Sequence, residues 1–292
     1  METAKKKTFS IRLGSARLAI SRTFCYIVLV FLTVLCLFSF YMLIINATRQ
    51  HGAIMSGFSW LPGNSFLYNA KNLFDDTNIP TLRALGNSLL VAGSCAALTT
   101  YFSAMTAFGL HAYQFRFKQA AFLFILFVMM VPYQVSTLGF IQLVTKMDMM
   151  DTYWPLILPK IAAPIVFFFM KQYMESVLPL EIVEAARVDG SNEFHTFNRI
   201  VLPMIKPAIA VQAIFSFVEN WNNYFVPALI INSNDKKTIP ILIAQLRSAD
   251  YLKFDLGKVY MMVFVAIIPV MIVYIFLSKF IIKGVTMGSL KG

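Results

Sequence analysis

The sequence is poor in charge and in cysteine. Only 13% of its 292 residues are charged, whereas 58% are hydrophobic, and a soluble domain carries roughly a quarter of charged residues. This balance excludes an ordinary soluble globular domain. The three cysteines, Cys25, Cys36 and Cys95, fall in apolar segments, and their spacing offers neither a disulfide framework nor a metal site. We interpret them as small buried hydrophobic residues.

Motifs for catalysis and nucleotide binding are also missing. No G-x-x-x-x-G-K-[ST] pattern occurs, so the chain lacks the loop that cradles ATP phosphates in P-loop proteins. His51, His111 and His195 stand apart without metal-ligand spacing, and we find no nucleophile with a partner base. The sequence therefore disfavours a membrane-embedded enzyme, and any use of ATP would require another subunit.

Acidic residues are scarce, which leaves a formal net charge of +11. The cations gather in the N-terminal arm, in two loops between apolar segments and in the tail. This distribution is typical of the positive-inside rule for membrane proteins. Because no basic stripe alternates with stacking aromatic residues, we predict that the chain does not bind nucleic acid.

What is abundant is long apolar runs. Runs of about 20 residues are long enough to cross a hydrocarbon core about 30 Å thick. We therefore predict an all-α, polytopic membrane protein with six transmembrane helices. The predicted spans are Phe24–Ile45, Asn87–Leu110, Ala120–Val144, Trp154–Met170, Met204–Ile231 and Lys258–Ile282.

The loop charges predict the orientation. They favour a cytoplasmic arm at 1–23, a transmembrane domain at 24–282 and a cytoplasmic tail at 283–292. The first apolar run exceeds the 7–15 residues of a typical signal sequence, so we expect it to be an uncleaved span. One outside loop, 232–258, is rich in Lys and disagrees with the rule, but the other loops agree.

A polar stretch at 171–203 interrupts the apolar spans and holds the most specific motif. It reads E-A-A, three residues, glycine, nine residues and I-x-L-P. The fixed positions are Glu184, Ala185, Ala186, Gly190, Ile200, Leu202 and Pro203. This pattern resembles the signature loop of permease subunits in bacterial ATP-binding-cassette (ABC) importers. The wider text, including Asp189, is similar to the carbohydrate-uptake branch and, within it, to the G-type, MalG-like permeases of maltose and oligosaccharide uptake.

The resemblance covers nearly the whole chain and implies a type I ABC importer transmembrane domain in the bacterial cytoplasmic membrane. It implies a permease subunit for sugars that works with a second, F-type permease, two ABC ATPase subunits and an extracytoplasmic sugar-binding protein. The ATPase subunits would bind ATP and Mg²⁺, while this chain would bind no cofactor. The signature loop would dock into a cleft of the ATPase. Two interpretations of the tail stay open: it approaches the interface of the two ATPase subunits, or it is a solvated basic end.

The residues of the loop predict a short helix. Pro179 suits the first turn of a helix, where its missing N–H costs nothing. Ile182, Ala185 and Ala186 share one face, and the two alanines allow a partner to approach closely. Gly190 can take a positive φ and end the helix.

The flanking polar residues predict how this helix is connected. We expect Ser191 to cap the next helix. Glu184 and Arg187 lie three residues apart, so they can pair with each other or with groups on the partner. Without the fixed spacing to Gly190, an amphipathic helix lying on the membrane surface would be the simpler interpretation.

A second polar set lies within the predicted fifth span. It consists of Phe215, Glu219, Asn220, Trp221, Asn222 and Asn223. An acid and several amides at membrane depth are costly, so they should face a cavity or another helix. Two interpretations stay open: the set lines the translocation path and binds sugar hydroxyls and rings, or it contacts the partner permease.

The alternative function is an autonomous secondary carrier or channel. Such a protein would show an internal repeat and a coupling acid within the membrane. Glu219 is a candidate acid. However, we find no convincing repeat, and this alternative leaves the signature loop unexplained.

Overall fold

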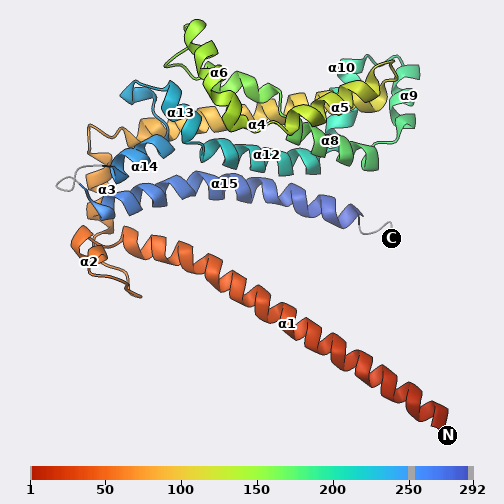
Figure 1. Ribbon diagram of the computed structural model, residues 1–292, viewed down its shortest axis with the longest axis horizontal. Helices are drawn as coiled ribbons and strands as arrows, with labels where there is room; N and C mark the ends of the chain where they lie inside the picture. Colours follow the sequence, from red (N-terminus) through yellow and green to blue (C-terminus); the bar gives the residue numbers. More distant parts are fainter. Residues whose placement is uncertain (1, 249–253, 289–292) are drawn as a thin grey trace. The chain divides into compact units, whose positions relative to one another are not determined.

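The structure is a computed structural model that describes residues 2–248 and 254–288. Within these ranges every regular element is a helix and no strand occurs. The chain divides into two compact units (Figure 1). Unit 1 comprises Met1–Ala70 with Leu256–Phe264, and unit 2 comprises Lys71–Asp255 with Val265–Gly292. The last four residues of the predicted tail lie outside the described residues.

Unit 1 is built on one long helix. The helices of this part of the chain are α1 (Glu2–Ala47), α2 (His51–Met55), the start of α3 (Phe66–Phe74) and the start of α15 (Leu256–Gly288). The predicted N-terminal arm and first span are thus one continuous helix. Its end is held by the fully buried Asn69, whose Nδ2 donates to the carbonyls of Ala47 and Arg49 at 2.9 Å.

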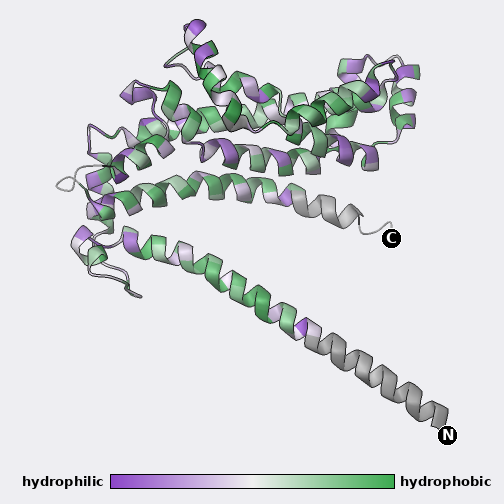
Figure 2. Ribbon diagram, in the orientation of Figure 1, coloured by the Kyte–Doolittle hydropathy of each residue, from purple (hydrophilic) through white to green (hydrophobic). Residues whose placement is uncertain are grey.

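Unit 2 contains the remaining helices. They are α4 (Thr81–Ala112), α5 (Lys118–Met129), α6 (Tyr133–Lys146), α7 (Trp154–Ile157), η1 (Leu158–Ile161), α8 (Pro164–Val177), α9 (Leu180–Val188), α10 (Glu193–Thr196), the π-helix η2 (Phe197–Val201), α11 (Leu202–Met204), α12 (Lys206–Trp221), α13 (Phe225–Ile230), η3 (Asn234–Lys236), α14 (Ile239–Arg247) and the rest of α15. Figure 2 shows α4 and α5 as largely hydrophobic.

Helix α4 lies at the centre of unit 2, where α12 and α8 pack along it. Small residues make this close packing possible. Ala92 and Ala96 pack against Phe217 and Trp221 of α12. Nearer the other end, Ala104 belongs to the largest buried cluster, which also contains residues of α8 and α9. Alanines of α4 therefore let α12 and α8 approach its backbone closely.

Four described helical segments are long and apolar enough to cross a membrane: Ser21–Ala47, Thr81–Ala112, Trp154–Val177 and Leu256–Phe280. A fifth candidate is the bent pair Glu193–Met204 and Lys206–Trp221, whose two parts meet at 83°. The all-helical, multi-span class is thus confirmed, while the number of predicted spans, six, is not.

Two of the predicted spans are interrupted, one of them at a proline. The predicted third span, Ala120–Val144, is two helices, because α5 ends at Met129 and α6 begins only after Pro132. Proline removes a backbone donor and disfavours helix in the residue before it. The predicted fifth span, Met204–Ile231, is also interrupted, since α12 ends at Trp221 and α13 starts at Phe225.

One carboxylate joins two loops of unit 2. Asp151 accepts hydrogen bonds at 2.9 Å from the backbone N–H groups of Asn232 and Ser233, and Lys236 Nζ lies 2.9 Å from its Oδ2. These hydrogen bonds, first among them that of the Ser233 hydroxyl, hold the pKa of Asp151 well below its ordinary value. The turn that begins the predicted fourth span is therefore fixed to the segment after α13.

Candidate functional site

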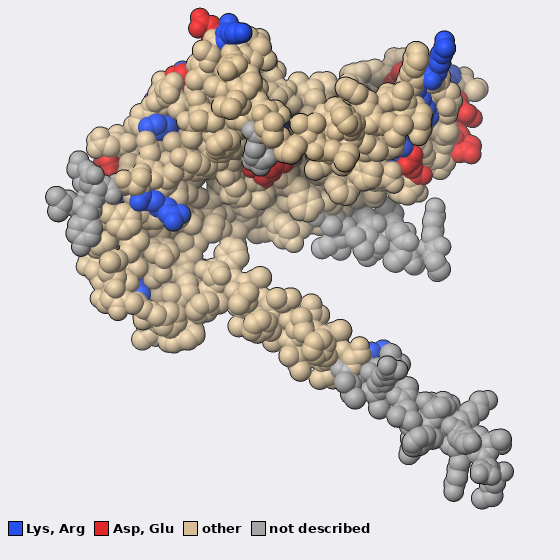
Figure 3. Space-filling view, viewed as in Figure 1, with Lys and Arg blue, Asp and Glu red and all other residues tan. Residues whose placement is uncertain are grey.

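Helix α9 carries the first half of the signature and has well-defined ends. It follows Pro179, which has φ −63° at the N-cap, and Glu181 lies in its first turn. A negative charge there is favourable because the N-terminus of a helix carries a partial positive charge. Figure 3 shows charged side chains gathered at the end of unit 2 that contains α9 and α10. The predicted helix start is confirmed.

The C-terminal end of α9 depends on Gly190. This glycine has φ +80°, and its N–H donates to the carbonyl of Arg187 at 3.0 Å. The N–H of Ser191 donates to the carbonyl of Ala186 at 2.9 Å. The pair of bonds forms a Schellman motif after the C-cap Asp189. The predicted positive φ at Gly190 is confirmed.

The two faces of α9 differ sharply. Val183 and Ala186 are 1% and 6% exposed and face the interior of unit 2. On the other side Glu184 and Ala185 are exposed, and Val188 is 88% exposed. The predicted common docking face of Ile182, Ala185 and Ala186 is therefore wrong in one member, because Ala186 is used for internal packing. We call Glu184, Ala185 and Val188 the exposed face of α9.

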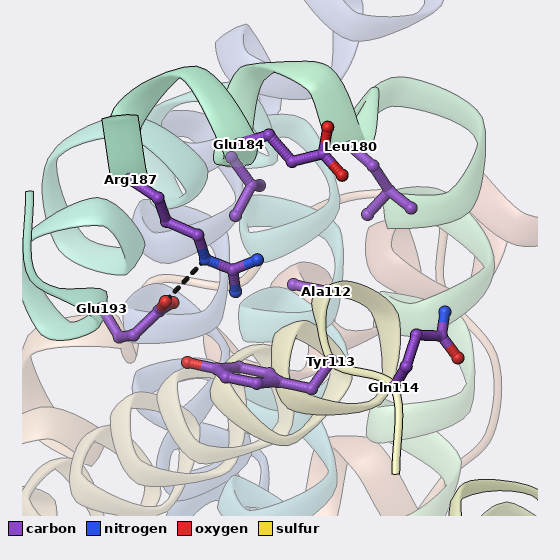
Figure 4. A pocket seen from close by; sticks show the side chains of 8 residues that line it. Ala112, Tyr113, Gln114, Leu180, Glu184, Arg187 and Glu193 are labelled. Atoms are coloured by element: carbon purple, nitrogen blue, oxygen red, sulfur yellow. Dashed lines mark hydrogen bonds and ion pairs between the residues drawn. The ribbon is translucent and has the colours of Figure 1, made fainter. Parts of the chain in front are cut away.

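Arg187 does not pair with Glu184. Its Nε lies 2.7 Å from Glu193 Oε1, and its guanidinium lies 5.2 Å above the ring of Tyr113 (Figure 4). The hydrogen bond from Arg187 lowers the pKa of the Glu193 carboxyl and raises the pKa of Arg187 itself. Burial raises the pKa of Tyr113, with a further contribution from Glu193. No sequence pattern predicts this link between α9, α10 and the end of α4.

The same three segments enclose a pocket of about 400 Å³. Glu184, Arg187 and Glu193 line it on one side, and Tyr113 and Gln114 line it on the other (Figure 4). Because the two sides come from the loop after α4 and from the signature segment, a group that enters the pocket would contact both.

Helix α10, in the second half of the signature, has a different N-cap residue from the predicted one. Asn192, not Ser191, caps α10, because its Oδ1 accepts from the N–H of His195 at 2.8 Å. The Ser191 hydroxyl instead contacts the Thr196 hydroxyl at 2.9 Å. An Asx side chain reaches the third N–H of the helix as well as serine does, so the sequence did not distinguish the two.

The second half of the signature is anchored by residues at variable positions of the motif. Phe197 and Val201 are 2% and 0% exposed and belong to the largest buried cluster. Ile200 and Leu202 are half-buried and Pro203 is exposed. The 83° bend into α12 lies between Met204 and Lys206. Pro207, in the first turn of α12, cannot donate a hydrogen bond back across this bend.

The polar set of the predicted fifth span separates into two groups. Asn220 and Trp221 are buried: Asn220 Nδ2 donates to the Ser216 carbonyl at 2.7 Å, and Trp221 Nε1 donates to the Ala266 carbonyl of α15 at 3.1 Å. The Asn220 hydrogen bond lies within α12, whereas that of Trp221 joins α12 to α15. In contrast, Phe215 and Glu219, one turn apart on α12, are exposed. Asn222, exposed, and Asn223, half-buried, follow the end of the helix.

Glu219 forms an ion pair that was not predicted from the sequence. Lys160 Nζ lies 2.9 Å from Glu219 Oε1, and the two side chains are 30% and 68% exposed. Lys160 belongs to η1, whose position is fixed by a hydrogen bond from Thr99 Oγ1 to the Lys160 carbonyl at 2.8 Å. The sequence does contain a signal for this ion pair, because Lys160 is the cation in the predicted fourth span and Glu219 is the acid in the predicted fifth span.

Among the residues that the structure describes, no group of three or more His, Cys, Asp or Glu is arranged to hold a metal ion. His51 and His111 instead contact the backbone of their own units, at Leu256 and Leu178 respectively. Neither candidate region therefore offers a described ligand set for a metal.

Comparison with known proteins supports the resemblance seen in the sequence. Residues 99–286 match the family model described as "Binding-protein-dependent transport system inner membrane component". The arabinooligosaccharides transport system permease protein AraQ of Halalkalibacterium halodurans is 36% identical over 210 residues, which cover 71% of this chain and 73% of AraQ. The maltodextrin transport system permease protein MdxG of Bacillus subtilis is 30% identical over 273 residues, covering 90% and 94%.

The fold has a counterpart among solved structures. A chain from the crystal structure of a bacterial ABC transporter involved in the import of the acidic polysaccharide alginate superimposes with a TM-score of 0.75. The match covers 88% of this chain and 96% of the other, at 19% identity. At that level of identity the likeness concerns the fold alone.

Proposed function

Because this chain belongs to the family of inner membrane components of binding-protein-dependent transport systems, we propose that it is a permease subunit of an ATP-driven sugar importer. The substrate class rests on the relatives, which transport arabinooligosaccharides and maltodextrin by their names. We propose an oligosaccharide as the solute. ATP and Mg²⁺ belong to a separate ATPase subunit.

The exposed face of α9 is the proposed contact with that ATPase. Val188, which is 88% exposed, and the exposed Ala185 give this face a small apolar surface that is available to a partner. The opposite face of the same helix is anchored in the core through Val183. A helix held rigidly on one side and exposed on the other transmits a rigid-body movement better than a flexible loop does. This arrangement is the single observation that carries the coupling role.

We propose that the Lys160–Glu219 pair lines the translocation path or lies at the contact with a second permease. Ions at membrane depth are costly where they meet lipid, so a pair with a 68% exposed carboxylate requires a polar or protein neighbour. Phe215 and the amides of Asn222 and Asn223 belong to the same proposed surface. An aromatic face and hydrogen-bonding side chains suit a carbohydrate.

The complete importer would contain a second, F-type permease, two ABC ATPases and an extracytoplasmic sugar-binding protein. Both ends of this chain and the α9 segment would lie in the cytoplasm, as the positive-inside rule favours. The segment around Asp151 and Lys236 would then lie outside, where the binding protein approaches. The two permeases would alternate their access as the ATPases close and open.

The test is reconstitution of this chain with its co-purifying subunits in proteoliposomes. We expect a binding protein loaded with one oligosaccharide to stimulate both ATP hydrolysis and sugar uptake. Glu184→Lys should abolish both stimulations while the protein stays inserted and assembled. Uptake that proceeds without ATP, or a Glu184→Lys variant with normal stimulation, would contradict the proposal.

A further inference from the structure

A second pocket lies next to the α9 segment, where α4 ends and α5 begins. It has a volume of about 220 Å³, less than the roughly 300–1,000 Å³ of a typical small-molecule site. Three basic residues line it, His111, Lys118 and Lys171, together with Phe122 and Glu175. The pocket is therefore the size of a small charged group and not of an oligosaccharide.

The carboxylate in this pocket is already engaged. Glu175 Oε1 forms an ion pair with Lys171 Nζ, and Glu175 Oε2 accepts from Gln172 Nε2 at 3.3 Å. The Lys171 side chain is only 11% exposed and its Nζ lies 4.5 Å from the centre of the Phe122 ring. Lys171 is thus held in a fixed position, and Glu175 neutralises only one of the charges around the pocket.

The remaining cation is Lys118. Its Nζ is 3.4 Å from the carbonyl of His111, a long contact to a neutral acceptor. His111 Nε2 donates to the Leu178 carbonyl at 3.0 Å, since a carbonyl can only accept. The pocket therefore has a net positive charge of one from Lys118, Lys171 and Glu175, without any contribution from His111. Lys118 also begins α5, so the positive end of that helix dipole adds to the field.

The pocket opens beside an apolar helix surface. α5 begins with Lys118 and then exposes Leu123, Phe124 and Phe127 at 54%, 65% and 67%. Figure 1 shows the start of α5 at the end of unit 2 that also holds α9 and α10. A basic pocket at the end of an exposed apolar helix lies where a membrane changes from headgroups to acyl chains.

We propose that this pocket binds the phosphate of an anionic phospholipid headgroup in the cytoplasmic leaflet, with Lys118 as its main contact. The acyl chains would lie along the exposed apolar side chains of α5. Basic pockets between membrane helices on the cytoplasmic side are suited to anionic headgroups. This proposal rests on the proposed function only for the choice of leaflet, because it takes the end of unit 2 that contains α9 to face the cytoplasm.

An anionic headgroup fits better than a zwitterionic one. An ethanolamine headgroup would bring a second cation beside Lys118 and Lys171, and the only carboxylate of the pocket already has partners for both oxygens. A phosphate with neutral glycerol hydroxyls brings no such repulsion. The lipid bound here would lie between α4, α5 and α8, next to the end of α4 that contacts Arg187 of α9.

The experiment is native mass spectrometry of the full chain, purified with its co-purifying subunits and titrated with short-chain phosphatidylglycerol. The same titration with short-chain phosphatidylethanolamine and with inorganic phosphate as competitor separates the possible ligands. We expect retention of phosphatidylglycerol, and about fivefold weaker retention in Lys118→Gln, as for one Lys–headgroup contact. Lys206→Gln removes an exposed cation at the start of α12 and serves as the matched control with unchanged retention.

Three outcomes would each overturn the lipid assignment. The first is equal retention of phosphatidylglycerol and phosphatidylethanolamine, and the second is an equal loss of lipid retention in Lys118→Gln and Lys206→Gln. The third is displacement of the bound lipid by millimolar phosphate. Lys171→Gln provides a second variant with the same expected direction. Sugar-stimulated ATP hydrolysis is measured on the same samples. Intact stimulation without lipid selectivity refutes only this pocket, whereas lipid selectivity without any stimulation refutes only the importer.

Discussion

The signature segment and the polar set of α12 are both polar stretches in an apolar chain, but their side chains are placed differently. In the signature segment, the buried side of α9 anchors the helix through Val183 and leaves Val188 exposed. In α12, Asn220 and Trp221 are buried, whereas Phe215 and Glu219 are exposed. The fixed spacing of the signature predicts a surface for a partner, whereas polar composition alone does not state which side chains of α12 are exposed.

The strongest test of this contrast is Val188→Asp. If α9 docks into a cleft, an unpaired carboxylate there must be desolvated, which costs more than about 1.4 kcal/mol, and a loss of that size lowers binding at least about tenfold. We expect ATP-dependent uptake to fall by that factor with insertion unchanged. Val188→Thr keeps the shape and the neutral charge and should stay close to wild type. Equal uptake in the two variants would contradict docking through this face.

Gly190→Val tests the backbone of the same helix. A Cβ at position 190 would meet nothing within 4 Å, so the effect comes only from the φ of +80°. A β-branched residue is strained there by about 1–2 kcal/mol, whereas asparagine tolerates this conformation. We expect thermal melting and uptake to decline in Gly190→Val and to be nearly preserved in Gly190→Asn. A similar decline in both variants would show that the helix end does not depend on positive φ.

Lys160→Met tests the exposed part of the α12 set. It leaves Glu219 without its partner, and because that carboxylate is 68% exposed we expect a loss of only about 1 kcal/mol. The melting temperature of the assembled protein measures it. The double variant Lys160→Met/Glu219→Met should recover part of the loss. Additive losses in the double variant would mean that the two side chains do not stabilise each other.

The smallest expected effect concerns Glu193 and pH. Its pKa is lowered by Arg187, so the ionised carboxylate contributes stability above its ordinary pKa of about 4.3 and loses it as the pH falls through the lowered value. Both partners are more than a third exposed, which limits the contribution to less than about 1 kcal/mol. We expect Glu193→Gln to melt slightly lower than wild type from pH 5 to 8. The difference should disappear as the pH falls through the lowered pKa of Glu193, and a difference that stays constant would contradict the ion pair.

Much of the fold was predictable, because apolar length and small-residue content are properties of the sequence. The all-helical class, the start of α9 and the positive φ of Gly190 all follow from local chemistry. The predicted number of spans is not confirmed, because Pro132 and the end of α12 divide runs that composition alone treats as continuous. Whether such a break interrupts a span depends on neighbouring helices that satisfy the freed backbone groups.

The sequence by itself determined the family, through residues at fixed spacing, and the apolar character of the chain. Only the tertiary structure decided which face of α9 is exposed, that Arg187 pairs with Glu193, and that Lys160 meets Glu219. Helical periodicity states which residues share a face, but it does not state which face meets the core. Partners separated by 59 residues, such as Lys160 and Glu219, come together only through the packing of α12 and η1 on α4.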